Sequence, residues 1–374
     1  MELSIESLAA GGDGVAHAAD GRVVFVPFTA PGDRVRVEIV ETRPRFLRAR
    51  VVELLAPGEA RTDPVCPVFG SCGGCAWQHV SVEAQRRAKG RIVADALRRL
   101  GGLAFGDTID VMPSPDAYGY RVRTRVLRQA GRTGYRRRRS HRLQAVSRCP
   151  VLVPALDAAL HDLALRDDAP DGEWELAAGV DTVRCQPIGA RGDALALCVG
   201  DDRLRVSPGA FFQSNGLLHE ALAAAVVRAA GTGDSLVEAF AGVGFFTLPL
   251  SRAFGRVTAI ESNAAAAADL RHNLAAADRG NVDVVPAPLE RAWEALPPAG
   301  TWVLDPPRSG LPAGSAERLA SRGARQVVYL SCDPATLARD LSRLCAQGYR
   351  LTEVSAFDLF PQTPHVEVLA ILRA

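Results

Sequence analysis

The sequence predicts a multidomain α/β protein built from three parts, and three patterns support this prediction. Short alternating strands separated by glycine and proline turns fill residues 1–56. A cysteine-rich and then arginine-rich stretch occupies residues 57–205, and from residue 206 apolar strands alternate with helical segments. We therefore expect a small OB-like β-barrel, a central α+β domain and a C-terminal doubly wound α/β domain.

Length and composition limit the class of protein. The 374 residues are 48% apolar, which is enough for two or three ordinary domains. No apolar run approaches the roughly 18 residues that a membrane helix needs, and Met1–Gly11 lacks the charged start and apolar core of a signal peptide. We expect a soluble, cytoplasmic protein with no membrane partner, in which the cysteines are thiols or metal ligands rather than disulfides.

The net charge of +2 conceals an uneven distribution of charge. Ala117–Arg148 contains 11 arginines and no acidic residue, whereas the rest of the chain carries 33 basic and 42 acidic residues. Such a basic block indicates a polyanionic partner. Lys89 is the only lysine, so part of the arginine preference reflects composition, and the clustering is the stronger signal.

Short alternating runs make up the N-terminal segment, and glycine-containing turns separate them. The runs are Leu3–Ile5, Arg22–Pro27, Arg34–Val40 and Ala49–Leu54. This pattern suits a small β-barrel that is either a scaffold or an RNA-binding module. Val23–Pro27 followed by Pro31-Gly32-Asp33-Arg34-Val35 resembles the TRAM domain, a small RNA-binding barrel.

Three cysteines, Cys66, Cys72 and Cys75, lie close together on a glycine-rich loop. Thiols at such short spacings can surround one metal centre, and Cys149 is a candidate fourth ligand. Four thiolates suit either zinc or a four-iron cluster. Three other cysteines fall in apolar strand or helix patterns, where we expect core residues. They are Cys185, Cys198 and Cys345.

The rest of the central region mixes helices and strands. Val82–Leu100 has the apolar spacing of an amphipathic helix, and Val151–Leu165 predicts a second one. Tyr118–Val146 alternates basic and apolar residues around a turn at Ala130–Gly134, which predicts a hairpin with one arginine-rich face. That face is either solvated or bound to phosphates, and the absence of acids to pair with the arginines favours phosphates.

The C-terminal region begins with a nucleotide-binding pattern. Leu236–Phe240 predicts a buried strand, Gly242 and Gly244 follow it as a Gly-x-Gly turn before a helix, and the next strand, Arg256–Ile260, ends on Glu261. The glycines let the backbone approach a ligand, and the carboxylate can accept hydrogen bonds from ribose hydroxyls. This order predicts a Rossmann-like domain.

Two further residues narrow the type of nucleotide. Glu238, four residues before the Gly-x-Gly turn, fits an S-adenosylmethionine site better than a dinucleotide site. Gln213 lies between aromatic and capping residues in Phe211-Phe212-Gln213-Ser214-Asn215, which is either a ligand contact or an ordinary helix cap.

A candidate nucleophile lies at the end of a later strand. Gln326–Leu330 predicts a buried strand, Asp333 can cap the next helix, and Cys332 therefore precedes a helix N-terminus, where the dipole favours a thiolate. A lone cysteine there could equally be a small buried residue. However, Asp305-Pro306-Pro307-Arg308 ends an earlier strand and His365-Val366-Glu367 lies in a late one. A nucleophile, a polar clamp and a carboxylate base would then meet at one sheet edge, as covalent catalysis requires.

With these pieces in order, the whole chain resembles the RNA (uracil-5-)-methyltransferases that join a TRAM barrel and an iron–sulfur domain to a class I methyltransferase domain. The matching pieces are the cysteine cluster, Phe211–Asn215, the Gly-x-Gly turn, Asp305–Arg308, Ser331–Thr336 and His365–Glu367. The resemblance implies a TRAM barrel over residues 1–56, an iron–sulfur and RNA-binding domain over 57–205 and a methyltransferase domain over 206–374.

The resemblance also implies roles for individual residues. Cys332 would be the nucleophile and Glu367 the base. The residues around S-adenosylmethionine would be Gln213, Phe240, Gly242, Gly244, Glu261 and Asp305. A 4Fe–4S cluster would be held by Cys66, Cys72, Cys75 and Cys149. The chain departs from the family at Phe245, where an Asn is common, and at Ala287-Pro288, where a polar residue is common near the adenine.

Uracil chemistry suits these residue types. The C5 atom becomes nucleophilic once a thiolate adds to C6, and a base must then remove the C5 proton. We expect a monomer that acts on 23S rRNA, with a tRNA uridine as the alternative substrate. Two other classes are an iron–sulfur protein that binds RNA without catalysis, which would not need Cys332 and Glu367, and a small-molecule methyltransferase, which would not need the barrel or the arginine block.

Overall fold

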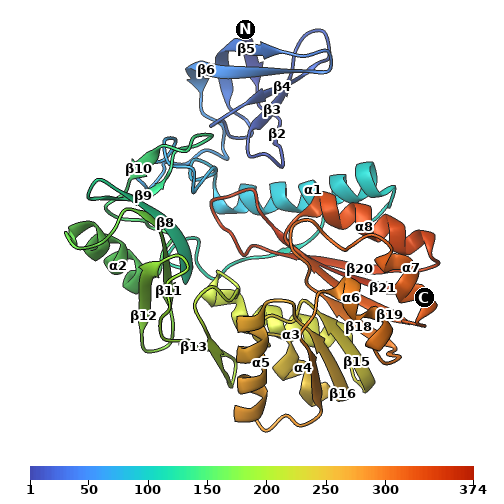
Figure 1. Ribbon diagram of the computed structural model, residues 1–374. Coiled ribbons are helices and arrows are strands. Elements are labelled where there is room, and N and C mark those ends of the chain that lie inside the picture. Colours follow the sequence, from blue (N-terminus) through green and yellow to red (C-terminus); the bar gives the residue numbers. More distant parts are fainter.

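The computed structural model describes all 374 residues, arranged in three parts (Figure 1). A small β-sheet domain at the N-terminus stands at one end of the molecule, a second β-rich domain lies beside the third part, and that third part is a layered α/β structure that includes the C-terminus. No helix has both the length and the apolar character needed to cross a membrane.

The N-terminal domain is a curled six-stranded sheet of order β1-β5-β6-β4-β3-β2. Its strands are β1 (Glu2–Ser4), β2 (Ser7–Leu8), β3 (Gly14–His17), β4 (Val23–Val26), β5 (Arg34–Thr42) and β6 (Phe46–Ala56). The strands β1 and β2 lie at opposite edges although only two residues separate them. The Ile5 N–H donates to Asp33 O and the Glu6 N–H donates to Val15 O, both at 2.8 Å, so these two residues link the two edges. The result is the predicted barrel-like domain around a small apolar core.

The central domain is a five-stranded antiparallel sheet of order β10-β9-β8-β11-β12, with helix α2 packed against it. Its elements are β8 (Arg123–Gln129), β9 (Arg132–Arg136), β10 (Leu143–Ala145), α2 (Pro154–Leu165), β11 (Gly172–Ala178) and β12 (Val183–Pro187). The predicted hairpin is present, with a tighter turn at Ala130-Gly131. The cysteine loop joins this sheet, because the Gly73 N–H donates to Arg136 O at 3.0 Å and the Arg138 N–H donates to Ser71 O at 3.1 Å.

The C-terminal part contains an eight-stranded sheet of order β17-β16-β15-β18-β19-β21-β20-β7. Its strands are β7 (Val111–Met112), β15 (Gly233–Ala239), β16 (Phe254–Ile260), β17 (Val282–Val285), β18 (Thr301–Leu304), β19 (Gln326–Ser331), β20 (Arg350–Phe357) and β21 (Glu367–Arg373). The strands from β17 to β19 are parallel, and β21 is antiparallel to both neighbours. The strand order reverses at β15 and β18, which is where doubly wound sheets bind nucleotides.

Helices cover both faces of this sheet (Figure 1). They are α1 (Val82–Gly101), α3 (His219–Ala230), α4 (Thr247–Ala253), α5 (Ala264–Ala276), α6 (Leu289–Ala292), α7 (Ser315–Ser321) and α8 (Pro334–Ala346). Helices α3, α4 and α5 share one apolar core, and α1, α6, α7 and α8 share the other. Along β19, Val328 and Leu330 enter the first core while Val327 and Tyr329 enter the second. A parallel strand buried on both faces explains the continuous apolar run in the sequence.

The packing does not follow the division expected at residue 206. Helix α1 and strand β7 come from the expected central domain, but α1 packs against α8 and β7 extends the C-terminal sheet beside β20. The hairpin of β13 (Leu195–Val199) and β14 (Asp202–Val206) also packs on this layer, and the Arg205 N–H donates to Asn273 Oδ1 at 2.7 Å. Segments that precede the expected boundary at residue 206 therefore form part of the C-terminal layer.

Most local predictions agree with the structure, and two need correction. The predicted helix from Val82 ends as expected, with Gly102 at a φ of 66° as its left-handed C-cap. Asp333 caps α8 by accepting a hydrogen bond from the Thr336 N–H. Cys198 is exposed rather than in the core, because the alternation of β13 turns it outward. His365 precedes β21 and does not lie in the strand.

Candidate active site

The residues expected to bind the cofactor gather where three adjacent parallel strands end. Phe240 follows β15, Glu261 follows β16 and Asp305 follows β18. Gln213, from a loop far away in sequence, reaches the same edge and its Nε2 lies 3.5 Å from Asp305 Oδ2. The sheet topology thus brings three of the expected residues to one edge, and the loop that carries Gln213 meets Asp305 there.

The turn after β15 has the strained backbone of a ligand-binding loop. Phe240 adopts a φ of 66°, which a bulky residue rarely does. Gly244 has a φ of 97°, and a Cβ there would lie 2.7 Å from Leu270 Cδ1. Glu261 holds the turn, since its Oε2 accepts the Gly242 N–H at 2.8 Å. A carboxylate has about four acceptor sites, so Glu261 retains capacity for ribose hydroxyls.

Gln213 is held in place by the apolar layer behind it. Its backbone carbonyl lies 2.8 Å from Nε2 of His219. The His219 ring in turn packs edge-on against Phe245, with ring centroids 5.2 Å apart. Phe245, where the sequence departs from the family pattern, is therefore a buried packing residue.

Glu238 and Asp305 form an acidic pair beneath this edge. Glu238 is 2% exposed, and its Oε2 has no hydrogen-bond partner. Burial raises the pKa of Glu238 to about 8, and desolvation raises the pKa of Asp305 to about 7. Buried carboxyl groups whose ionised forms are destabilised in this way would favour a cation between them. The sequence pattern identified Glu238 as a sign of an S-adenosylmethionine site but did not predict that its carboxyl group is buried, because burial depends on the fold.

Cys332 and Glu367 come together because β19 and β21 are antiparallel neighbours. The antiparallel register pairs Ser331 with Val368. Cys332, which follows Ser331, therefore stands opposite Glu367, which precedes Val368. Burial raises the pKa of Glu367 well above its ordinary value, and the nearby Asp305 adds to that rise. The predicted nucleophile and the predicted base therefore lie at the same edge of the sheet.

The protonation state of Cys332 differs from the sequence-based expectation. Burial, with a further contribution from the charge of Glu367, raises the pKa of the thiol to about 11. The helix N-terminus was expected to favour a thiolate, whereas burial of the thiol favours its neutral form. Arg308 lies beside the thiol and acts in the opposite direction, lowering its pKa. This guanidinium is the group placed to stabilise a thiolate.

The four clustered cysteines also meet in space. Cys66, Cys72, Cys75 and Cys149 all line one cavity of about 400 Å³ between the cysteine loop and the central sheet. All are free thiols. No set of three or more His, Cys, Asp or Glu side chains is arranged to hold a metal ion. The four predicted ligands therefore line the same cavity, but their sulfur atoms are not arranged around a single metal position.

The arginine block is less free than its sequence suggests. Acidic residues from elsewhere in the chain pair with six of its arginines. The pairs are Arg123–Glu175, Arg128–Asp171, Arg136–Glu173, Arg138–Asp13, Arg139–Asp13 and Arg148–Asp157. The premise that these side chains lack carboxylate partners is therefore wrong for more than half of them. Arg125, Arg132, Arg137 and Arg142 are exposed and have no carboxylate partner.

A doubly wound sheet with a Gly-x-Gly turn, an acidic residue after the next strand and carboxyl groups at its switch point defines a class I methyltransferase fold, and such enzymes use S-adenosylmethionine. Comparison with known proteins agrees. The TRAM domain family model matches residues 1–52, and the tRNA (Uracil-5-)-methyltransferase family model matches residues 298–374.

Several relatives match along the full chain, and two of them illustrate the similarity. An uncharacterized RNA methyltransferase of Streptomyces coelicolor is 34% identical over 100% of this chain and 92% of its own length. The 23S rRNA (uracil(1939)-C(5))-methyltransferase RlmD of Pseudomonas aeruginosa is 34% identical over 100% of this chain and 94% of its own. The chain therefore belongs to the family of TRAM-domain RNA (uracil-5-)-methyltransferases.

A solved structure supports the fold. The tRNA (uracil-54, C5)-methyltransferase of Pyrococcus abyssi, in complex with S-adenosyl-L-homocysteine, aligns with a TM-score of 0.78 and 24% identity, covering 100% of both chains. All three parts of the molecule thus have counterparts in a single known architecture.

Proposed function

We propose that this enzyme methylates C5 of a uridine in structured RNA through a covalent bond between Cys332 Sγ and C6 of the base, with Glu367 removing the C5 proton. The observation that carries this proposal is the opposition of Cys332 and Glu367 across β19 and β21. A nucleophile and a base on facing strands can act on adjacent atoms of one flat ring.

The steps balance with the residues present. The Cys332 thiol gives its proton to solvent, and the Sγ–C6 bond then forms and makes C5 nucleophilic. C5 bonds to the methyl carbon as the bond from that carbon to the donor sulfur breaks, which leaves a neutral thioether. Glu367 then takes the C5 proton, and the Sγ–C6 bond breaks to return the thiolate. Because the Cys332 thiol has a raised pKa, it must lose its proton first, and Arg308 stabilises the resulting thiolate. A base with a raised pKa, such as Glu367, is better suited to accept a carbon-bound proton.

S-adenosylmethionine, when bound, supplies the methyl group as a sulfonium cation. The strained turn at Phe240 and the acceptor sites of Glu261 suit its nucleoside. The carboxyl groups of buried Glu238 and half-buried Asp305 suit its positive charges, and the partnerless Glu238 Oε2 is a ready acceptor for an ammonium group. Gln213 closes this space beside Asp305.

The substrate that we propose is 23S rRNA. The full-length relative from Pseudomonas is named for that RNA and is 34% identical, whereas the Pyrococcus protein named for tRNA is 24% identical. The tRNA alternative is favoured by the description of the family model that matches residues 298–374. The exposed arginines of the central domain would bind phosphates of either RNA.

We also propose that Cys66, Cys72, Cys75 and Cys149 hold a 4Fe–4S cluster. Four thiols around a cavity of about 400 Å³ suit a multi-atom cluster better than one zinc ion, which needs all four sulfurs within a single tetrahedron. A bound cluster would cross-link the cysteine loop to the central domain through Cys149. The chain's own residues already align the loop for this through the Gly73–Arg136 hydrogen bond.

The test of the catalytic proposal separates the two residues. Unmodified transcripts of 23S rRNA and of tRNAs are incubated with methyl-labelled S-adenosylmethionine. Glu367→Gln should accumulate a denaturant-resistant protein–RNA complex that contains labelled RNA linked through Cys332, and Cys332→Ala should form neither complex nor product. Turnover by Glu367→Gln at the wild-type rate, or a link through another cysteine, would overturn the mechanism. The transcript that is labelled identifies the substrate.

A further inference from the structure

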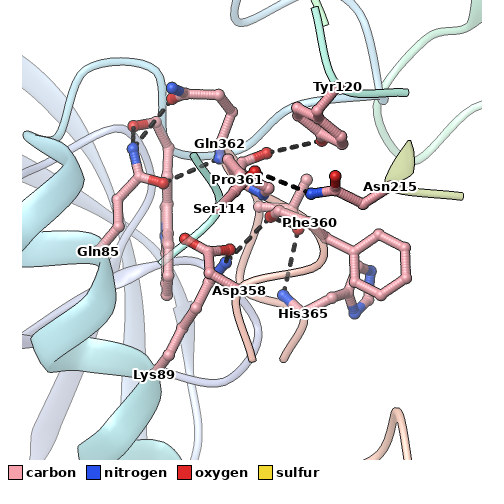
Figure 2. Close-up of polar contacts among 12 residues, drawn as sticks. Gln85, Lys89, Ser114, Tyr120, Asn215, Asp358, Phe360, Pro361, Gln362 and His365 are labelled. Atoms are coloured by element: carbon pink, nitrogen blue, oxygen red, sulfur yellow. Dashed lines mark hydrogen bonds and ion pairs between the residues drawn. The ribbon is translucent and has the colours of Figure 1, made fainter. Parts of the chain in front are cut away.

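The segment that connects β20 to β21 leads directly into Glu367, and a buried polar network holds this segment from outside the C-terminal half of the sequence. Figure 2 shows this network, in which Gln85 and Lys89 of helix α1 reach the segment Asp358–His365. The two helical residues are four apart and therefore lie on the same face of α1. Neither contributes to the site described above.

Gln85 makes a reciprocal contact with Gln362. Its Nε2 donates to Gln362 Oε1 at 2.9 Å, and its Oε1 accepts the Gln362 N–H at 2.9 Å. The same Nε2 lies 2.8 Å from Val80 O. Gln85 is 0% exposed and Gln362 is 2% exposed. The Gln85 amide thus binds both the side-chain oxygen and the backbone N–H of Gln362, and such a pair of hydrogen bonds in a dry environment fixes the relative arrangement of the two residues.

Gln362 is also tied to the cysteine loop. Its carbonyl oxygen accepts the N–H groups of Ala76 at 2.9 Å and Trp77 at 3.0 Å, immediately after Cys75. Its φ of 70° is a strained value for a side-chain-bearing residue. A strained conformation persists only where the surrounding contacts determine it, and here they come from α1 and from the cysteine loop.

Lys89 anchors the start of the same segment. Its Nζ donates to Asp358 Oδ1 at 2.5 Å and to Phe360 O at 3.0 Å, and both charged side chains are at most 1% exposed. The chain uses arginine at every other basic position, yet its single lysine is fully buried here. A compact ammonium fits a closed site where a guanidinium would not. An ion pair this buried adds little net stability, and its effect is to fix the position of the segment relative to α1.

We infer that Gln85 and Lys89 are positioning residues that set the distance between Glu367 and the substrate, an inference that rests on the catalytic proposal for Glu367. They act through Asp358, Phe360 and Gln362, and the segment then reaches Glu367 within five residues of Gln362. Their loss should therefore slow the step that Glu367 performs while sparing the steps that depend on Cys332.

The experiment measures these steps separately in single turnovers with methyl-labelled S-adenosylmethionine and an unmodified transcript that the wild type methylates. Total label in RNA reports methyl transfer, and loss of label from the denaturant-resistant complex reports proton removal and release. Gln85→Met and Lys89→Met should leave methyl transfer within about twofold of wild type and slow release at least tenfold. The pH dependence of release should also shift, because the surroundings of Glu367 change.

Leu97→Ala is the matched control, because Leu97 is a buried residue of α1 that packs in the α1–α8 core. It should lower the melting temperature and leave the ratio of transfer to release unchanged. If Gln85→Met does not fold, Gln362→Asn serves instead, since Asn tolerates a left-handed backbone but its shorter side chain loses the contact with Gln85.

Normal release by Gln85→Met or Gln362→Asn, or equally slow release by Leu97→Ala, would overturn the inference. Glu367→Gln in the same assay distinguishes a failure of the positioning role from a failure of the catalytic proposal. If its complex accumulates while release by Gln85→Met is normal, only the positioning role fails. If Glu367→Gln turns over at the wild-type rate, the catalytic proposal and the positioning role fail together.

Discussion

Cys332 and Glu367 face each other where β19 ends and β21 begins, since the antiparallel register pairs Ser331 with Val368. Burial raises the pKa of the Cys332 thiol, and the nearby Glu367 carboxylate raises it further. The site that brings the proposed nucleophile and the proposed base together therefore favours the protonated thiol in the free enzyme. Arg308 provides the opposing charge.

The opposing effects of Glu367 and Arg308 on the thiol pKa predict how fast Cys332 is alkylated at different pH values. With a pKa of about 11, the thiolate fraction should rise about tenfold per pH unit from pH 7 to pH 10. The rate of iodoacetamide alkylation at Cys332, followed by peptide mass spectrometry in the ligand-free protein, should rise in parallel. Glu367→Gln removes a negative neighbour, so it should lower the pKa of the thiol and speed alkylation at pH 8, whereas Arg308→Ala should slow it.

The exposed Cys198 is the internal reference for the reagent, and its alkylation should be the same in all three proteins. An alkylation rate at Cys332 that is already maximal at pH 7 would show that the helix N-terminus dominates and that desolvation does not.

Glu238 predicts how stability depends on pH. A carboxyl whose pKa is raised to about 8 by burial contributes stability that is fully present below its unfolded pKa, and this contribution is lost as the pH rises toward 8. Each pKa unit corresponds to about 1.4 kcal/mol. Glu238→Gln should therefore stabilise the ligand-free protein by roughly 2–4 kcal/mol at pH 8 and by much less at pH 5.

Urea unfolding at the two pH values measures this difference. The exposed Glu317→Gln is the control and should leave the free energy of unfolding unchanged at both pH values. Equal effects of Glu238→Gln at pH 5 and pH 8 would mean that the carboxyl does not titrate in this range.

The ion pairs of the central domain decide which arginines are free to bind RNA. Reversing Arg125, Arg132 and Arg142 to Glu should weaken RNA binding at least tenfold near 0.1 M salt and reduce the slope of log Kd against log salt by about two to three, because each lost phosphate contact releases one counterion fewer. S-adenosylmethionine affinity should stay the same.

Reversal of Arg228, Arg350 and Arg373, which are exposed and lie outside the block, is the charge-matched control. If both triple variants change the slope equally, net charge explains the binding and the block has no special role. Arg138 and Arg139 are poor targets, since both pair with Asp13 of the N-terminal domain.

The cysteine cavity predicts metal content. Protein purified without oxygen should be brown and contain about four irons per chain, and Cys72→Ser should lose them together because each thiolate holds one corner of a single cluster. Cys198→Ser is the control and should keep the iron. One zinc per chain in protein made with ample iron would contradict the cluster and favour the mononuclear alternative.

The sequence by itself determined the kinds of elements and their chemistry. Continuous apolar runs predicted β15, β18 and β19, the Asp333 cap predicted the start of α8, and the Gly-x-Gly turn with Glu261 predicted a nucleotide site. These signals are local, since they depend on backbone dihedrals and on spacing within about ten residues. The clustering of Cys66, Cys72 and Cys75 is readable for the same reason.

Only the tertiary structure decided which of these groups meet and in what state. The register of β19 against β21 places Glu367 beside Cys332, and the resulting desolvation reverses the expectation of a thiolate. Asp13 neutralises arginines more than a hundred residues away in sequence. Gln85 holds Gln362 across 277 residues. Burial and long-range pairing are properties of the packed chain, and no local pattern encodes how much water a side chain will lose or which charge will stand next to it.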